Sequence, residues 1–198
     1  MSLTSICCKR LEHCIVSNTS WRTHNILSDC QHGFRAMWSC KTQIITLLHE
    51  LSSSLDKGIQ TDMIILYFSK AFDRVPHLRL LKKIQHYGNR GNTHKWIWSF
   101  LFNRSQQVVA EGKSSETVPV ISGVPQGSVL GPRLFLMFIN DLPENLTSVT
   151  RLFSDNAIFY RHIYTLEDQA LLQNYLVKLE EWEQLWGMEF HPPPPPTK

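Results

Sequence analysis

M-I-I-L-Y-F-S-K-A-F-D, residues 63 to 73, is the stretch that decides the fold of this chain. The part from Asp62 to Phe68 is rich in isoleucine and leucine and is too short for a helix, so it is predicted to be a buried β-strand. A helix follows, which Val75 and Pro76 open and which ends near Gly88. The stretch is therefore expected to form a strand in the core that leads into a helix.

Two further segments complete the pattern. The first, S-G-V-P-Q-G-S-V-L-G-P, runs from Ser122 to Pro132 and contains glycine turns. The second, R-L-F-S-D-N-A-I-F-Y, runs from Arg151 to Tyr160 and places an acidic turn between two apolar, β-prone runs. A strand that ends at Tyr67 beside a hairpin that turns at Asp155 and Asn156 brings these three positions together at one edge of a sheet.

Apolar residues at three- and four-residue spacing predict further helices. They cover residues 2–18, a segment that Ser39 caps and Gly58 stops, a segment around 96–101, residues 128–140, and Leu166 to Trp186. Residues 106–120 are predicted to form a hairpin with its turn near Gly112. The side chains expected to face inward in the helix after Pro76 are Leu78, Leu80, Leu81 and Ile84.

Composition sets broad limits on the class of protein. The chain has 198 residues, of which 42% are hydrophobic, enough for one ordinary core or two small lobes. Its net charge of +3 is too small to indicate a nucleic-acid partner by itself. No apolar run approaches the roughly 18 residues of a membrane span, and the first residues are too polar for a signal peptide. We expect an intracellular protein of the nucleus or cytoplasm, not a secreted one, with no membrane partner.

The 5 cysteines all lie in the first forty residues, and their odd number argues against a disulfide framework. A zinc site that combines some of them with His13 or His32 is conceivable, although no C-x-x-C pair supports it. Free, mostly buried thiols are the preferred interpretation. The cysteines are Cys7, Cys8, Cys14, Cys30 and Cys40.

In their order and spacing, the three segments resemble the palm of reverse transcriptases, most closely those of jockey-like non-LTR retrotransposons. In that family the first run reads D-F-S-K-A-F-D and the turn reads F-A-D-D. The resemblance implies that Tyr67 and Asn156 stand at two of the three metal-site aspartate positions, and that Asp155 is the third. It covers about residues 2 to 190, nearly the whole chain.

The resemblance implies an α/β (α+β) fold of the polymerase fingers-and-palm type, in which helices flank a small antiparallel palm sheet. Residues 1–190 form this unit, with fingers at about 1–60 and 88–120 and palm at about 61–87 and 121–190. Residues 191–198 form a proline-rich tail, because five consecutive prolines enter neither a helix nor a central strand. The thumb, the lysine-bearing loop and the endonuclease of such elements are absent from this sequence.

Nucleotide transfer uses two divalent ions about 3.5–4 Å apart, held by oxygen ligands that include at least two carboxylates. By resemblance the cofactor is Mg²⁺, and its ligands here would be Asp155, the Asn156 side-chain carbonyl and the Phe68 backbone carbonyl. Asp155 is the only full carboxylate of the set and the one catalytic aspartate retained. Tyr67 offers a neutral phenol. The sequence therefore predicts that metal binding is weak or lost and that polymerase activity is lost.

No neighbouring carboxylate replaces the missing one. Asp62 lies five residues before Tyr67, roughly 16 Å away along a strand. Asp73 lies beyond the connection, and the family has that aspartate in addition to the catalytic one.

Four further residues match nucleotide-binding positions of the family. Arg35, in Q-H-G-F-R, corresponds to an arginine that contacts the triphosphate, and Phe72 to the residue beneath the incoming sugar. Gln126 and Gly127, in P-Q-G-S, form a turn suited to close approach of a nucleotide or template base. Without the resemblance, the same residues would be interpreted as a surface arginine, a core phenylalanine and a common turn.

A basic cluster lies in and after the helix that Pro76 opens. A solvent-exposed face explains this cluster better than a surface that binds nucleic acid. The cluster comprises Lys82, Lys83, His86, Arg90, His94, Lys95 and Arg104.

The expected function is that of a degenerate reverse transcriptase domain, with an RNA template, a DNA primer and, if active, deoxynucleotides as partners. A nucleic-acid-binding module without chemistry and an interaction protein that reuses the fold are the alternatives. The sequence does not determine the oligomeric state.

Overall fold

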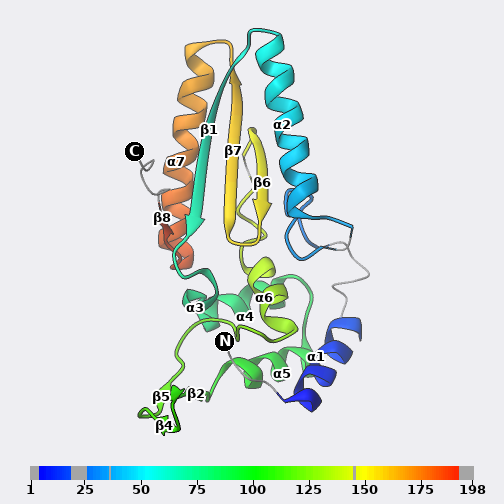
Figure 1. Cartoon of the computed structure of the whole chain (residues 1–198), viewed down its shortest axis with the longest axis vertical. Coiled ribbons are helices and arrows are strands. Elements are labelled where there is room, and N and C mark those ends of the chain that lie inside the picture. Colours follow the sequence, from blue (N-terminus) through cyan, green and yellow to red (C-terminus); the bar gives the residue numbers. More distant parts are fainter. Residues whose placement is uncertain (1–4, 19–25, 36, 145, 192–198) are drawn as a thin grey trace. The chain divides into compact units, whose positions relative to one another are not determined.

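The computed structural model describes residues 5–18, 26–35, 37–144 and 146–191 (Figure 1). The chain forms two compact units. The first comprises Met1–Ile26 and Lys70–Phe138 and is mainly helical; the second comprises Leu27–Ser69 and Ile139–Lys198 and contains the main sheet. The proline-rich segment after His191 and its predicted separation from the domain lie outside the described residues.

The sheet unit is built on four strands in the order β6-β7-β1-β8. These are β1 (Gln60–Phe68), β6 (Val149–Phe153), β7 (Asn156–Ile163) and β8 (Phe190–His191). The strands β1 and β7 pair antiparallel along their whole length, from Gln60 opposite Ile163 to Tyr67 opposite Asn156. The small antiparallel sheet that the sequence predicts is thus confirmed.

Two long helices cover opposite faces of this sheet: α2 (Cys40–Asp56) and α7 (Leu166–Trp186) (Figure 1). Tyr160 in β7 donates its hydroxyl hydrogen to Glu50 of α2. The next residue, Arg161, contacts Asp168 of α7 with an Nη2 to Oδ1 distance of 2.8 Å. Successive side chains on a strand point to opposite faces, so α2 and α7 lie on opposite sides of β7.

Both helices begin where the sequence predicts, because local capping groups fix their first turns. The Ser39 hydroxyl accepts from the Thr42 N–H, and the Thr42 hydroxyl accepts from the Ser39 N–H, which is a capping box. Thr165 and Asp168 form the same arrangement at the start of α7. That helix ends at Gly187, whose φ of 67° is the left-handed conformation that glycine adopts at low cost.

The helical unit contains α1 (Ile6–Asn18), α3 (Ala71–Arg74), α4 (His77–His86), α5 (Gly91–Leu101) and α6 (Leu130–Phe138). Short strands β2 (Ser105–Gln106), β3 (Val109–Ala110), β4 (Lys113–Ser114) and β5 (Val118–Pro119) join α5 to the glycine turns before α6. The predicted turn near Gly112 is confirmed, because Ala110 pairs with Lys113 across it. The fully buried core side chains of this unit include Leu80, Ile84, Ile97, Leu101, Leu134 and Phe138.

The prediction that β1 is a buried strand is wrong for most of its length. Phe68 is buried, but every residue from Gln60 to Tyr67 is half-buried or exposed. The reason is position: among the described residues, β1 pairs on its outer side only with the two-residue strand β8, at Tyr67 and Phe68. An apolar run identifies a strand but cannot reveal how much of its edge is covered.

Burial predictions elsewhere are also corrected. Leu78 is 66% exposed, whereas Leu80, Leu81 and Ile84 are buried as expected. Leu78 lies in the first turn of α4, at the margin of the face that these three residues share. All five cysteines are free, as predicted, but Cys30 is half-buried and the others are exposed. None of the described helices is long and apolar enough to cross a membrane.

Candidate functional site

Tyr67 is the centre of a row of three side chains across the sheet. It pairs with Asn156 of β7 on one side and with His191 of β8 on the other. Side chains of directly paired residues project from the same face, with Cα atoms about 4.5–5.5 Å apart. Asp155 immediately precedes Asn156, and its carbonyl accepts the Phe68 N–H at 3.0 Å. The structure therefore brings Tyr67, Asp155 and Asn156 together at the end of β1, as the sequence predicts.

This cluster offers one anionic oxygen donor group. Asp155 supplies a carboxylate, Tyr67 a phenol that is 38% exposed, and Asn156 an amide. No described residue forms a hydrogen bond with the Asp155 carboxylate. Across the described residues there is no group of three His, Cys, Asp or Glu side chains that could hold a metal ion, which also leaves the conceived zinc site without a counterpart.

The acidic turn rests on the Q-H-G segment. The side-chain oxygen of buried Gln31 accepts from the backbone N–H of Ser154 at 3.2 Å and from that of Gly33 at 2.7 Å. A methyl group at Gly33 would lie 2.4 Å from the Ser154 nitrogen, so only glycine fits there. Ser154 itself has a φ of 55°, a left-handed conformation that needs such support.

Backbone contacts extend this support along β6. The His32 N–H donates to the Leu152 carbonyl and the Leu152 N–H donates to the Cys30 carbonyl, both at 2.8 Å. Gln31 thereby forms a parallel bridge with Leu152. The Q-H-G segment and the acidic turn, distant in sequence, form one structural element.

The His32 ring is buried against Trp38, with ring centroids 4.1 Å apart. Burial lowers the pKa of His32 below its ordinary value, and the positive charges of Arg151 and Arg35 lower it further. Both effects favour the neutral form of the imidazole.

Arg35 is held by its own loop. Its guanidinium pairs with Asp29 at 3.4 Å, and the side chain retains only 16% exposure. It also donates to the carbonyl oxygens of Ser28 at 3.0 Å and Gln31 at 3.3 Å. The same guanidinium lies 5.8 Å from the centre of the Trp38 ring. A triphosphate at this arginine would have to compete with these contacts.

The other predicted nucleotide contacts belong to the helical unit. Phe72 stacks on Phe135 with ring centroids 4.8 Å apart, as a core phenylalanine would. Gln126 donates to the carboxylate of Asp73 at 3.1 Å. Gly127 has a φ of 85°, which explains why this turn requires glycine.

The start of α6 already has a carboxylate as its partner. Glu12 of α1 is fully buried, and one of its oxygens accepts from the backbone N–H of Val129 at 2.7 Å and of Leu130 at 2.9 Å. The Ser128 hydroxyl accepts from the Gly131 N–H at 2.9 Å. The exposed N–H groups of a helix start attract anions, and here an internal anion satisfies them.

Sequence reasoning missed Glu12 and His191. A single glutamate in a helical stripe gives no indication of the distant helix that it caps. A two-residue strand before a proline run gives no periodicity. The Phe190-His191 pair next to a helix end was the one available signal for β8.

The basic cluster after Pro76 is not uniformly solvated. Lys83 is only 4% exposed; its ammonium donates to the Phe138 carbonyl and lies 4.7 Å from the Phe138 ring centre. Burial lowers the pKa of Arg104, and the charge of Glu12 acts in the opposite direction. At Lys83 the interpretation as a plain solvated face is wrong, and Arg104 is half-buried.

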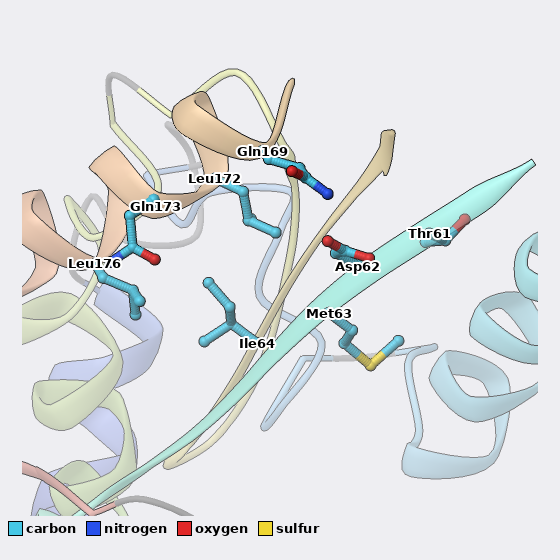
Figure 2. A pocket seen from close by; sticks show the side chains of 8 residues that line it. All are labelled: Thr61, Asp62, Met63, Ile64, Gln169, Leu172, Gln173 and Leu176. Carbon is cyan, nitrogen blue, oxygen red and sulfur yellow. The ribbon is translucent and has the colours of Figure 1, made fainter. Parts of the chain in front are cut away.

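A groove of about 490 Å³ lies at the opposite end of β1 from Tyr67 (Figure 2). Its walls are β1 and the first half of α7, and Asp62 is the one charged residue among those that line it. The lining residues are Thr61, Asp62, Met63, Ile64, Gln169, Leu172, Gln173 and Leu176. The Asp62 carboxylate accepts from the Gln60 amide at 2.9 Å.

Comparison with family models identifies the chain. Residues 1–193 match the model of the reverse transcriptase (RNA-dependent DNA polymerase) family. The chain belongs to the reverse transcriptase family.

Curated relatives place this reverse transcriptase domain among non-LTR retrotransposons. It is 30% identical over 195 residues to the RNA-directed DNA polymerase from mobile element jockey of Drosophila funebris, covering 92% of this chain and 21% of that protein. It is 28% identical over 211 residues to the probable RNA-directed DNA polymerase from transposon BS of Drosophila melanogaster, covering 97% of this chain and 22% of that protein. The chain thus spans about a fifth of the length of these relatives.

Solved structures confirm the fold. Telomerase from Candida albicans, in complex with a fragment of telomeric RNA, matches with a TM-score of 0.58 at 12% identity, covering 92% of this chain and 33% of that chain. Apo telomerase from Candida tropicalis matches with a TM-score of 0.55 at 10% identity, covering 96% of this chain and 40% of that chain. At such identities the likeness concerns the fold alone.

Proposed function

We propose that this chain is a reverse transcriptase domain of a non-LTR retrotransposon whose two-metal polymerase site has been lost. The observation that carries the proposal is the pairing of Tyr67 with Asn156 beside Asp155. In the family resemblance, these three positions belong to aspartates. Here two of the three have neutral side chains.

The donor set does not fit a pair of divalent ions. Two hard cations at about 3.5–4 Å need at least two carboxylates to offset their charge. Asp155 supplies one carboxylate, and Asn156 and the Phe68 carbonyl supply neutral oxygens. The phenol at Tyr67 adds bulk without supplying a carboxylate. We therefore derive no polymerisation step for this chain and infer that Mg²⁺ binding is weak or lost.

The remaining assignments follow from family membership and stay proposals. They include the fingers and palm ranges and the nucleotide contacts of Arg35, Phe72, Gln126 and Gly127. The ion pair of Arg35 with Asp29 supports the loss of triphosphate binding, because a bound phosphate would have to displace it.

An RNA template and a DNA primer are the proposed partners of the ancestral domain. If the chain still binds an RNA–DNA duplex, its affinity should fall steeply with salt, because each phosphate that a cation neutralises releases a counterion. Fluorescence anisotropy with a labelled duplex at several salt concentrations measures this slope. Binding without salt dependence would argue against a groove whose cations bind the phosphate backbone.

Primer extension on an RNA template, with Mg²⁺ or Mn²⁺ and deoxynucleotides, tests the loss of activity. The unaltered chain should extend no primer. Because the chain spans about a fifth of the length of its relatives, the decisive experiment introduces the residues of this chain into an active relative. Placing tyrosine and asparagine at its two matching aspartates should abolish extension. Templated synthesis by the unaltered chain would contradict the proposal.

A further inference from the structure

The two units of the chain differ in charge. The helical unit carries thirteen lysines and arginines against four aspartates and glutamates, a net charge of +9, whereas the sheet unit carries seven against thirteen, a net charge of −6. The net charge of +3 for the whole chain conceals this difference. A basic excess confined to one unit favours an anionic partner for that unit.

The basic excess is concentrated around α4 and α5. Between Asp73 and Glu111 the sequence contains seven lysines and arginines and no acidic residue. Lys82, Arg90 and Lys95 are exposed around the corner where α4 ends and α5 begins. None of the described carboxylates forms an ion pair with these three cations. Their charges therefore remain available to a ligand.

Two stacked aromatic pairs run along α5 beside these cations. Trp98 stacks on Phe102 with ring centroids 5.0 Å apart and an angle of 10° between the ring planes. Trp96 stacks on Phe100 at 5.2 Å and 17°. Residues four apart lie one above the other on a helix, so each pair forms a row along the helix axis.

The exposed face of α5 lies between the two aromatic rows. At about 100° per residue, Asn92 and Ser99 fall between the rows, and both are exposed. Lys95 lies three residues before Trp98, next to the same row. Trp98 itself is 43% exposed, although a tryptophan buries a large apolar area when it packs in a core. The face thus combines an open aromatic ring, a neighbouring cation and small polar side chains.

We propose that the exposed face of α5 binds single-stranded nucleic acid. An unpaired base stacks on Trp98, and Lys95 binds the phosphates together with Lys82 and Arg90 at the nearby corner. Aromatic rings beside a row of cations bind single strands in this way without reading their sequence. A duplex hides the faces of its bases, so it offers only phosphates to this surface. The inference goes beyond the proposed function and does not depend on the metal site, because the acidic turn belongs to the sheet unit.

The polar residues of the same face argue against a lipid surface as the ligand. A helix that lies in a membrane interface needs a continuous apolar face. The exposed residues of α5 around Trp98 include Lys95, Ser99 and Asn92, which are all polar. One ring is enough to stack with a base but does not anchor a helix in a bilayer.

Fluorescence anisotropy of the full chain measures this binding directly. The probe is a fluorescein-labelled oligothymidylate of about 15 nucleotides, in EDTA so that metal binding plays no part. Affinity should fall steeply with salt, and the single strand should bind more tightly than a duplex of the same length. The absence of binding, or tighter binding of the duplex, would overturn the proposal.

Substitutions at Trp98 and Lys95 separate stacking from charge. Trp98→Leu should lower the affinity about tenfold without changing the salt slope, and Trp98→Phe, which keeps a ring, should recover most of the loss. Lys95→Gln should reduce the salt slope by about one. Lys113→Gln, in the exposed strand β4 of the same unit, is the matched control and should leave the slope unchanged. Equal effects of the two lysine variants, or unchanged affinity in Trp98→Leu, would refute a site on α5.

Photocrosslinking of the unaltered chain locates the site without any substitution. An oligothymidylate that contains 5-iodouracil crosslinks to the aromatic residues on which its bases stack, and peptide mapping should place the crosslink at Trp98. Phosphatidylserine vesicles should not displace the oligonucleotide. A crosslink confined to the sheet unit would contradict the proposal, and displacement by vesicles that bind Trp98→Leu more weakly would assign the face to a membrane instead.

Discussion

Tyr67 of β1 lies directly opposite Asn156 of β7, and the two side chains project from the same face of the sheet. Asp155, in the turn that leads into β7, is bound to the end of β1 through the Phe68 N–H. Under the proposed function, this is the backbone arrangement of a polymerase metal site in which two of the three side chains are neutral. The fold needs the apolar residues around the site, and it does not need the carboxylates, which repel one another when no cation is present.

Gly33→Ala should destabilise the sheet unit by about 2–3 kcal/mol, because the added methyl group meets the Ser154 backbone nitrogen. Chemical denaturation followed by circular dichroism measures the change. Gly58→Ala is a useful comparison, because Gly58 has open space around its Cβ, so its loss of stability reports only the cost of its positive φ, which Gly33 does not have. If both variants lose equal stability, the close approach of Gly33 to the acidic turn is unimportant.

Gln31→Met keeps the side-chain volume but removes the oxygen that accepts from Ser154 and Gly33. Two N–H groups lose their partner, which costs roughly 2 kcal/mol. Amide exchange at Ser154 should accelerate together with that of Gly33. Unchanged protection at Ser154 would show that Gln31 does not hold the turn.

Glu12→Met should destabilise the helical unit by about 2–4 kcal/mol, because the Val129 and Leu130 N–H groups would then be buried without an acceptor. Glu12→Gln retains an acceptor oxygen and should recover most of the loss. Exchange of the Val129 and Leu130 amides reports the effect locally. Equal losses in the two variants would assign the role of Glu12 to its charge instead of its capping bonds.

Much of the fold follows from local signals. The Ser39 and Thr165 caps and the three- to four-residue apolar spacing mark α2 and α7 at their starts, because these features act within a few residues of the chain. The strand-and-turn pattern also places Tyr67 beside Asn156, because both strands must bury their apolar side chains. The burial of Lys83, the capping of α6 by Glu12 and the partial exposure of the β1 side chains could not be predicted in this way. Each depends on a contact, or on the lack of one, between segments far apart in sequence.

The contact of Tyr160 with Glu50 predicts a stability change at high pH. Burial, together with the hydrogen bond to Glu50, raises the pKa of Tyr160 from 10.0 to about 12. The protonated phenol therefore stabilises the fold fully below pH 10, and this stabilisation is lost as pH rises toward 12. The loss should reach up to roughly 3 kcal/mol, given about 1.4 kcal/mol per unit of pKa. In Tyr160→Phe the free energy of unfolding should vary less across this interval; an identical pH profile would contradict the assignment.

Titration with Mn²⁺ by isothermal calorimetry tests the central claim most directly. The unaltered chain should show no saturable binding, because Asp155 alone cannot hold the ion. Tyr67→Asp should create a measurable site, Asn156→Asp should strengthen it by less, and adding Asp155→Asn should abolish it. Saturable Mn²⁺ binding by the unaltered chain, lost on Asp155→Asn, would contradict the account.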